Sequence, residues 1–169
     1  MIKPAFFSFP DPVNEVAARL VAAGVLLMSA LAIAFNLKWA VFVLTYGFLA
    51  RVLTGPTMSP LGQFVTRILT PRLAIAARPV PGPPKRFAQG MGLVVTATAA
   101  ILTAFGEWDA AKITLGLIIV AAFLESVLGY CLGCKAFALL MRAGVIPEEV
   151  CERCNDIRRA PTASYREHV

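Results

Sequence analysis

Four long apolar runs limit the folds that this chain can adopt. A helix that crosses the hydrocarbon core of a membrane needs about 20 predominantly apolar residues. The chain is 58% hydrophobic and only 15% charged, whereas a soluble domain has about 25% charged residues. The runs are Leu20–Leu37, Trp39–Leu53, Phe87–Gly106 and Ile113–Cys134, and the only charged residues within them are Arg51 and Glu125.

These runs predict an all-α integral membrane bundle of four transmembrane helices, arranged as two hairpins. The competing interpretation is a buried helical core in a soluble protein. The near absence of charge on every side of the helices favours the membrane. The second run is the shortest, and a helix there needs flanking residues to become long enough to cross the membrane. We expect residues 1–143 to form the transmembrane domain and residues 144–169 to form a cytoplasmic tail.

The joint between the second and third runs predicts a further, interfacial helix over residues 60–70. Ser59 is a suitable N-cap and Pro60 suits the first helical position. Apolar residues then follow helical spacing, and Pro71 is expected to kink or end the helix. The helix can lie on the membrane surface, or it can pack as a short cap across the bundle. We expect "RPVPGPPKR", which follows, to be a stiff extended linker.

The distribution of charge predicts the topology. Residues 51–86 contain no acidic residue, whereas the turn at 107–112 has a net charge of −1 from Glu107, Asp109 and Lys112. Positive loops stay in the cytoplasm, so we expect the long joint and both termini there, provided that the second run crosses. Basic residues beside apolar spans are better explained by lipid headgroups than by nucleic acid, which we do not expect as a partner. The basic residues of the joint are Arg51, Arg67, Arg72, Arg78, Lys85 and Arg86.

Three segments of the chain together resemble a known family. These are "SPLGQFVTRILTPRL", "KRFAQGMGLV" and "AFLESVLGYCLGCKAF". They resemble the domain of unknown function 4395, a family of bacterial membrane proteins, over roughly residues 8–141. The resemblance implies a small multi-pass protein of the bacterial inner membrane with a Cys-x-x-Cys motif near its end. It also implies thioredoxin-like or sulfurtransferase-like partners. The tail segment "VCERCNDIRR" lies outside the resemblance.

Four cysteines form two pairs of equal spacing, Cys131-x2-Cys134 and Cys151-x2-Cys154, with 16 residues between the pairs. This spacing fits a tetrahedral four-cysteine zinc site. However, the residues after Cys134 predict a continuing helix, in which Cys131 and Cys134 share a face instead of forming a zinc knuckle. His168 is a further potential ligand near the terminus. Zinc is the only cofactor that the sequence suggests.

The same cysteines also fit dithiol chemistry, which is our leading hypothesis for function. A Cys-x-x-Cys pair can cycle between dithiol and disulfide, and we expect Lys135 to lower the pKa of Cys134. Cys131 and Cys134 would form the membrane-proximal pair. Cys151 and Cys154 in the tail would exchange disulfides with this pair or resolve a mixed disulfide formed on it. The chain would then perform thiol–disulfide exchange or sulfur transfer with a soluble partner. The alternative is that the cysteines are small structural residues in an apolar helix.

The two charged residues within the runs give the remaining candidates. Ionisable groups inside membrane spans are costly and often functional. Arg51 and Glu125 lie 12 residues into their runs, so they reach a similar depth, and we expect them to form an ion pair. The pair can simply stabilise the bundle, or it can line a polar pocket that opens toward Cys131, with Glu125 transferring protons. A small transporter for a sulfur-containing anion is a further hypothesis. The substrate, the electron acceptor, the enzymatic status and the oligomeric state stay open.

Overall fold

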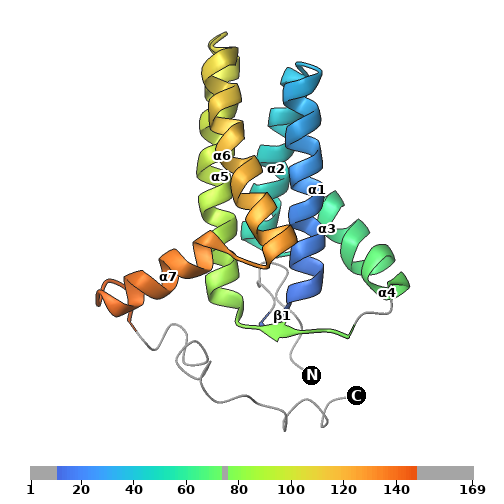
Figure 1. Cartoon of the computed structure of the whole chain (residues 1–169), viewed down its shortest axis with the longest axis vertical. Coiled ribbons are helices and arrows are strands. Elements are labelled where there is room, and N and C mark those ends of the chain that lie inside the picture. The colour runs from blue at the N-terminus through green and yellow to red at the C-terminus, as the bar shows by residue number, and fades with distance from the viewer. Residues whose placement is uncertain (1–10, 74–75, 148–169) are drawn as a thin grey trace, which may run out of the picture.

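Four long helices lie side by side and form the body of the molecule (Figure 1). The structure, a computed structural model, describes residues 11–73 and 76–147. α1 contacts α2 and α6, and α5 contacts the same two helices. The predicted all-α class is therefore confirmed. The bounds of the four helices are α1 Glu15–Ala34, α2 Lys38–Thr54, α5 Gly82–Ala104 and α6 Trp108–Leu128.

Shorter elements surround one end of this bundle. One helical segment follows α2 and projects to one side, and α7 projects to the other side (Figure 1). A two-residue strand before α1 pairs antiparallel with a strand before α5. The short elements are β1 Val13–Asn14, α3 Pro60–Phe64, the π-helical turn η1 Val65–Leu69, α4 Thr70–Arg72, β2 Pro79–Val80 and α7 Leu132–Arg142.

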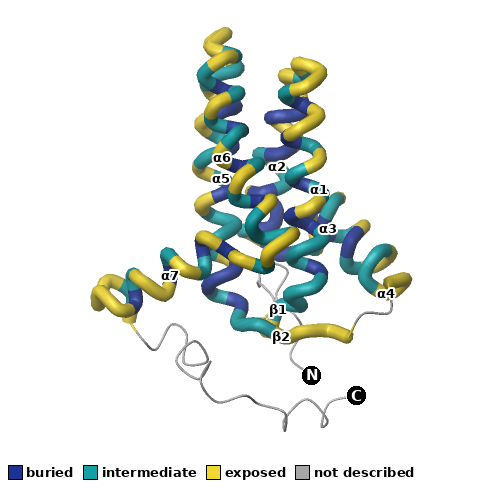
Figure 2. The backbone as a smooth tube through the Cα atoms, viewed as in Figure 1, coloured by how far each residue is buried: buried dark blue, intermediate teal, exposed yellow. Residues whose placement is uncertain are grey.

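The outward faces of the long helices are apolar and exposed, whereas buried residues follow the faces that meet (Figure 2). A soluble monomer rarely exposes such a continuous apolar surface. Small residues at the helix contacts are typical of membrane bundles, because they let the backbones approach closely. The exposed residues include Leu27, Phe42, Val94, Ile101 and Leu117, and the buried contacts include Ala22, Ala32, Ala40, Ala99, Ala111 and Ala122.

Three helices, α1, α5 and α6, are long and apolar enough to cross a membrane, and α2, with 17 residues, is shorter. The membrane character predicted from composition is thus supported for these three. All three begin five residues before the corresponding apolar runs, and α6 starts at Trp108 instead of Ile113. α1 starts at Glu15 instead of Leu20, with Asn14 as its N-cap, and α5 starts at Gly82 instead of Phe87. The first turn of α5 therefore includes Lys85, which the sequence places in a linker.

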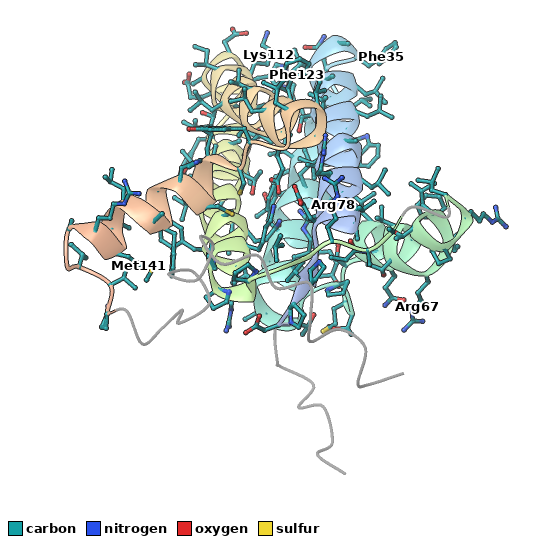
Figure 3. The ribbon with its side chains drawn as sticks, turned by 60° about the horizontal axis from the view of Figure 1, so that its bottom comes forward. Phe35, Arg67, Arg78, Lys112, Phe123 and Met141 are labelled. Atoms are coloured by element: carbon teal, nitrogen blue, oxygen red, sulfur yellow. The ribbon has the colours of Figure 1, made fainter. Side chains whose placement is uncertain are left out.

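The α1–α2 and α5–α6 connections lie at the same end of the bundle. Trp108 Nε1, at the start of α6, donates a hydrogen bond to Asn36 Oδ1 in the first connection, at 2.8 Å. Phe35 and Lys112 mark this end, whereas Arg67 and Arg78 lie toward the other (Figure 3).

The segment after α2 begins as the sequence predicts. The side chain of Ser59 accepts a hydrogen bond from the backbone N–H of Gly62, and Pro60 occupies the first turn. The helical conformation continues through the π turn to Arg72, so Pro71 lies one residue before the end instead of stopping the helix itself. Val65 is fully buried against Ala17 and Val21 of α1. The segment therefore packs against the side of α1.

The fourth apolar run divides into two helices, so the predicted continuous helix through Cys134 is wrong. Gly129 adopts a left-handed conformation with φ +67°, which ends α6 at Leu128; glycine is the residue that accepts this conformation without strain. Arg19 of α1 donates hydrogen bonds to the carbonyl oxygens of Ser126 and Val127, which α6 leaves unpaired at its end. The chain then turns and starts α7 at Leu132.

Candidate dithiol site

Cys131 and Cys134 lie at the N-terminus of α7. Cys131 is the N-cap residue in an extended conformation, and Cys134 is in the first turn. Both thiols are free; Cys131 is buried and Cys134 is partly buried. The two thiols lie close enough that a hydrogen bond between them perturbs the pKa of both. The two cysteines thus approach each other as expected, but across a helix terminus and not within a continuous helix.

Gly133 fixes the position of this helix terminus. A Cβ atom at residue 133 would lie 2.4 Å from Ala88 Cβ and 2.5 Å from Ala88 Cα. α7 therefore starts in direct contact with the backbone of α5, at a distance that only glycine permits. Farther along α7, the rings of Phe137 and Phe87 meet edge to face, with centroids 5.6 Å apart.

Glu125 forms an ion pair with Lys85, not with Arg51. Lys85 Nζ lies 2.7 Å from Glu125 Oε1, and the two side chains are only 10% and 15% exposed. The expected direct pair with Arg51 is thus replaced, because α5 starts five residues before the apolar run and carries Lys85 into the bundle. Lys85 and Glu125 both act electrostatically on the thiols of Cys131 and Cys134.

Arg51 is buried and has other hydrogen-bond partners. Its Nε donates to Gln89 Oε1 at 2.8 Å, and its Nη1 donates to Ser59 Oγ at 3.2 Å. The guanidinium lies over the ring of Phe48, 4.5 Å from the centroid, a favourable cation–π arrangement. Arg51 therefore joins α2 to α5 and to the start of α3. The carboxylate of Glu125 still acts electrostatically on the Arg51 guanidinium, although the two groups do not form an ion pair.

The two thiols have unequal acidity. The hydrogen bond from Cys134 lowers the pKa of Cys131, and the nearby ammonium of Lys85 adds to this effect. The same hydrogen bond, together with burial, raises the pKa of Cys134. The expected lowering of the Cys134 pKa by Lys135 is wrong. The ammonium of Lys135 lies instead over the ring of Tyr130, 5.4 Å from its centroid.

This asymmetry predicts how the alkylation of Cys131 depends on pH. The thiolate is the reactive form, so the rate rises with pH through the pKa, and a lowered pKa moves this rise to lower pH. Cys134→Ala removes the hydrogen-bond donor, so we expect the rise to move to higher pH. The measurement is the iodoacetamide rate at Cys131, followed by mass spectrometry in a chain with Cys151→Ser and Cys154→Ser.

The matched control for this prediction is Cys134→Ser, which keeps a hydroxyl donor and should shift the profile less than alanine does. An unchanged profile in Cys134→Ala would show that Cys134 does not stabilise the Cys131 thiolate.

A cavity of about 330 Å³ adjoins Cys131. It lies between α1, α2, α5 and α6, and its lining is mostly apolar. Arg51, Gln89 and Glu125 also line it. Arg51, Glu125 and Cys131 therefore meet at one cavity, although Arg51 and Glu125 do not form the predicted pair.

The structure leaves the zinc hypothesis open. Within residues 11–73 and 76–147, no group of three or more His, Cys, Asp or Glu side chains is arranged to hold a metal ion. Cys151, Cys154 and His168, which complete the predicted ligand set, lie outside the described residues.

Sequence reasoning missed two residues of the site, Lys85 and Gln89. Lys85 is one of several basic residues in the joint, and nothing local indicates that it points inward. Gln89 is a polar residue in an apolar run, within the segment "RFAQ" that carries the family resemblance. A polar side chain in such a run was the available signal.

The family model described as "Domain of unknown function (DUF4395)" matches residues 13–142. The match covers most of the chain, including all four long helices and Cys131 and Cys134, so the chain belongs to this family. Comparisons with curated proteins and with solved structures give no match.

Proposed function

We propose that this DUF4395 member is a multi-pass protein of the bacterial inner membrane whose Cys131–Cys134 dithiol exchanges with the disulfide of a soluble, thioredoxin-like partner. One observation carries the proposal: two free thiols lie together at the N-terminus of α7, one at the N-cap and one in the first turn. The lowered pKa of Cys131 and the raised pKa of Cys134 support it. This division of acidity suits a dithiol in which one sulfur attacks and the other resolves.

In the proposed topology α2 also crosses, so that α1–α2 and α5–α6 are two transmembrane hairpins. The hydrogen bond between Trp108 and Asn36 supports this, because it joins both connections at one end. α7 and the α3–α4 segment project sideways toward the opposite end (Figure 1). The part of the chain from this segment to the start of α5 contains the basic residues Arg67, Arg72, Arg78, Lys85 and Arg86. The segment exposes Phe64 and Ile68, which suits a position at the membrane interface. The positive-inside rule then places the dithiol on the cytoplasmic side.

The proposed exchange has two steps. The Cys131 thiolate attacks the partner's disulfide, forms a mixed disulfide and releases one partner thiolate. Cys134 then loses its proton and attacks the Cys131 sulfur, which releases the second partner thiolate and leaves a Cys131–Cys134 disulfide. The partner's two thiolates take up two protons: the one that Cys131 lost when it ionised, which passes through solvent, and the one that Cys134 loses. Glu125 is the carboxylate that acts on both thiols, so we propose that it relays the proton of Cys134.

The test uses the purified full chain carrying Cys151→Ser and Cys154→Ser. On incubation with oxidised thioredoxin we expect a Cys131–Cys134 disulfide, a loss of two mass units and an equal amount of reduced thioredoxin. Cys134→Ser should stop at a mixed disulfide on Cys131, and Cys131→Ser should slow the exchange at least 100-fold. No exchange by the reduced dithiol would overturn the proposal. One tightly bound zinc per unmodified chain, with all four cysteines protected, would favour the metal site instead.

A further inference from the structure

The cavity beside Cys131 has a polar end and an apolar end. Arg51, Gln89 and Glu125 line the end next to the dithiol. Val95 lies six residues beyond Gln89 along α5, and Leu117 lies eight residues before Glu125 along α6. At 1.5 Å per residue, the apolar end is about 9–12 Å away from these polar groups. A ligand that fits must therefore be polar at one end and apolar along the rest of its length.

The rim of the cavity belongs to the apolar outer surface of the bundle. Four lining residues are themselves exposed: Met91, Leu117, Val120 and Leu132, with 40–61% of their surface accessible. They come from α5, α6 and the start of α7. In a membrane such side chains face lipid, so a ligand can enter the cavity from the bilayer.

The size of the cavity also limits the ligand. A cavity of about 150 Å³ holds one benzene molecule, and this cavity is about 330 Å³. It therefore has room for a substituted six-membered ring and the first part of a hydrocarbon tail. A longer tail would leave between the exposed residues of the rim.

We infer that this cavity binds the ring of a membrane quinone, which accepts the electrons of the Cys131–Cys134 dithiol. The inference rests on the proposed dithiol chemistry. Thiol–disulfide exchange is reversible, so a partner in its reduced, dithiol form can regenerate the Cys131–Cys134 dithiol from its disulfide, and the quinone then accepts the two electrons. The Arg51 guanidinium is a buried donor that can bind a quinone carbonyl oxygen, and Cys131 lines the same space. Two S–H bonds break and one S–S bond forms. The two electrons and two protons pass to the quinone, which leaves as a quinol.

The inference explains why a dithiol would face an apolar cavity at all. Thiol–disulfide exchange with a soluble protein does not require an apolar cavity beside the attacking sulfur. Cys131 is 8% exposed and lines the cavity. Its burial suits a reaction with a small molecule that arrives through the bilayer. An acyl chain of a membrane lipid is the competing occupant.

The test uses the full chain with Cys151→Ser and Cys154→Ser, reduced and placed in lipid nanodiscs. The probe is a fully substituted benzoquinone with a ten-carbon tail, because substitution prevents direct addition of thiols to the ring. We expect one quinol per disulfide formed. Val120→Phe, at the rim, should slow this reaction at least tenfold. The control, Val94→Phe, is also exposed on an outer helix face but does not line the cavity, and should not change the rate.

A binding measurement that needs no electron transfer completes the test. In Cys134→Ser the dithiol reaction cannot occur, and the same quinone should slow alkylation of Cys131 at least fivefold, but not in combination with Val120→Phe. Equal rates in Val120→Phe and Val94→Phe, with no protection of Cys131, would show a lipid-filled cavity and overturn the quinone site. If thioredoxin exchange persists in that case, the proposed function stands without it. Loss of both thioredoxin exchange and quinone reduction would contradict the proposed dithiol function itself.

Discussion

Replacing Lys85 with methionine is expected to lower the free energy of unfolding by about 3–5 kcal/mol, the usual cost of removing one partner of a buried ion pair. The substitution keeps most of the length of the side chain but leaves the Glu125 carboxylate without its ammonium at 2.7 Å. Both side chains are largely buried between α5 and α6, so water cannot replace the lost partner. The measurement is denaturant unfolding in mixed micelles, followed by circular dichroism.

Two variants separate the ion pair from other effects of the substitution. Lys85→Met combined with Glu125→Leu removes both charges and should recover most of the lost stability, because an apolar pair can replace a buried ion pair at little cost. Arg86→Met removes the neighbouring cation of α5, which is exposed and donates to the carbonyl oxygen of Val52, and should cost about 1 kcal/mol. A loss in Lys85→Met no larger than in Arg86→Met would show that the pair is not significant for folding.

The same substitution should also reduce thiol reactivity. Lys85 lowers the pKa of Cys131, whereas Glu125 raises it. Without Lys85, the unbalanced carboxylate disfavours the Cys131 thiolate. The alkylation rate of Cys131 should therefore fall at neutral pH and recover partly in the double variant.

Hydropathy predicted the helices well because burial in a membrane depends on local composition. Each apolar run of the sequence overlaps one of the long helices over most of its length. Ser59 and Pro60 start the next helix as expected, since capping depends on adjacent residues. The start of α5 was missed for a related local reason. "GPPKR" resembles a linker, but Pro83 and Pro84 lie in the first turn of α5. The N–H groups in the first turn of a helix have no partner within the helix, so proline, which lacks an N–H, loses no hydrogen bond there.

The ion pair and the helix break could not be predicted from local patterns. Equal depth in the membrane suggested that Arg51 and Glu125 would meet, but depth does not specify the direction in which each helix face points. Lys85 and Glu125 face each other, and Arg51 turns toward Gln89 and Ser59 instead. The sequence is apolar on both sides of Gly129, so hydropathy gives no sign that α6 ends there. The end of the helix is visible only in the left-handed backbone of Gly129. The dithiol was recognised by its spacing, but its place at a helix terminus beside a cavity required the structure.

Gly133→Ala is expected to have the second largest effect, because the new methyl group has no space. Its Cβ would lie 2.4 and 2.5 Å from two atoms of Ala88, and one of these is Cα, which cannot rotate away. Overpacking of this kind costs about 1–3 kcal/mol when the structure can shift. The available shift is a movement of the start of α7 away from α5. This movement would carry Cys131 away from the cavity.

Stability and reactivity should therefore change together in Gly133→Ala. We expect a lower unfolding midpoint in mixed micelles, at least a tenfold slower reduction of the tailed benzoquinone, and faster alkylation of Cys131 by iodoacetamide because the thiol becomes more exposed. The control is Gly90→Ala in α5, where a Cβ meets nothing within 4 Å. It should leave both reactions unchanged and slightly stabilise the helix.

A second variant examines the backbone contact itself. Ala88→Gly added to Gly133→Ala removes the methyl group that the new Cβ would strike, but the contact with the Cα of residue 88 at 2.5 Å remains. We therefore expect only partial recovery of stability and of quinone reduction. Full recovery would mean that the two side-chain methyl groups alone determine the spacing of α5 and α7. Partial recovery would show that the dithiol is positioned by contact between the two helix backbones, for which residue 133 must be glycine.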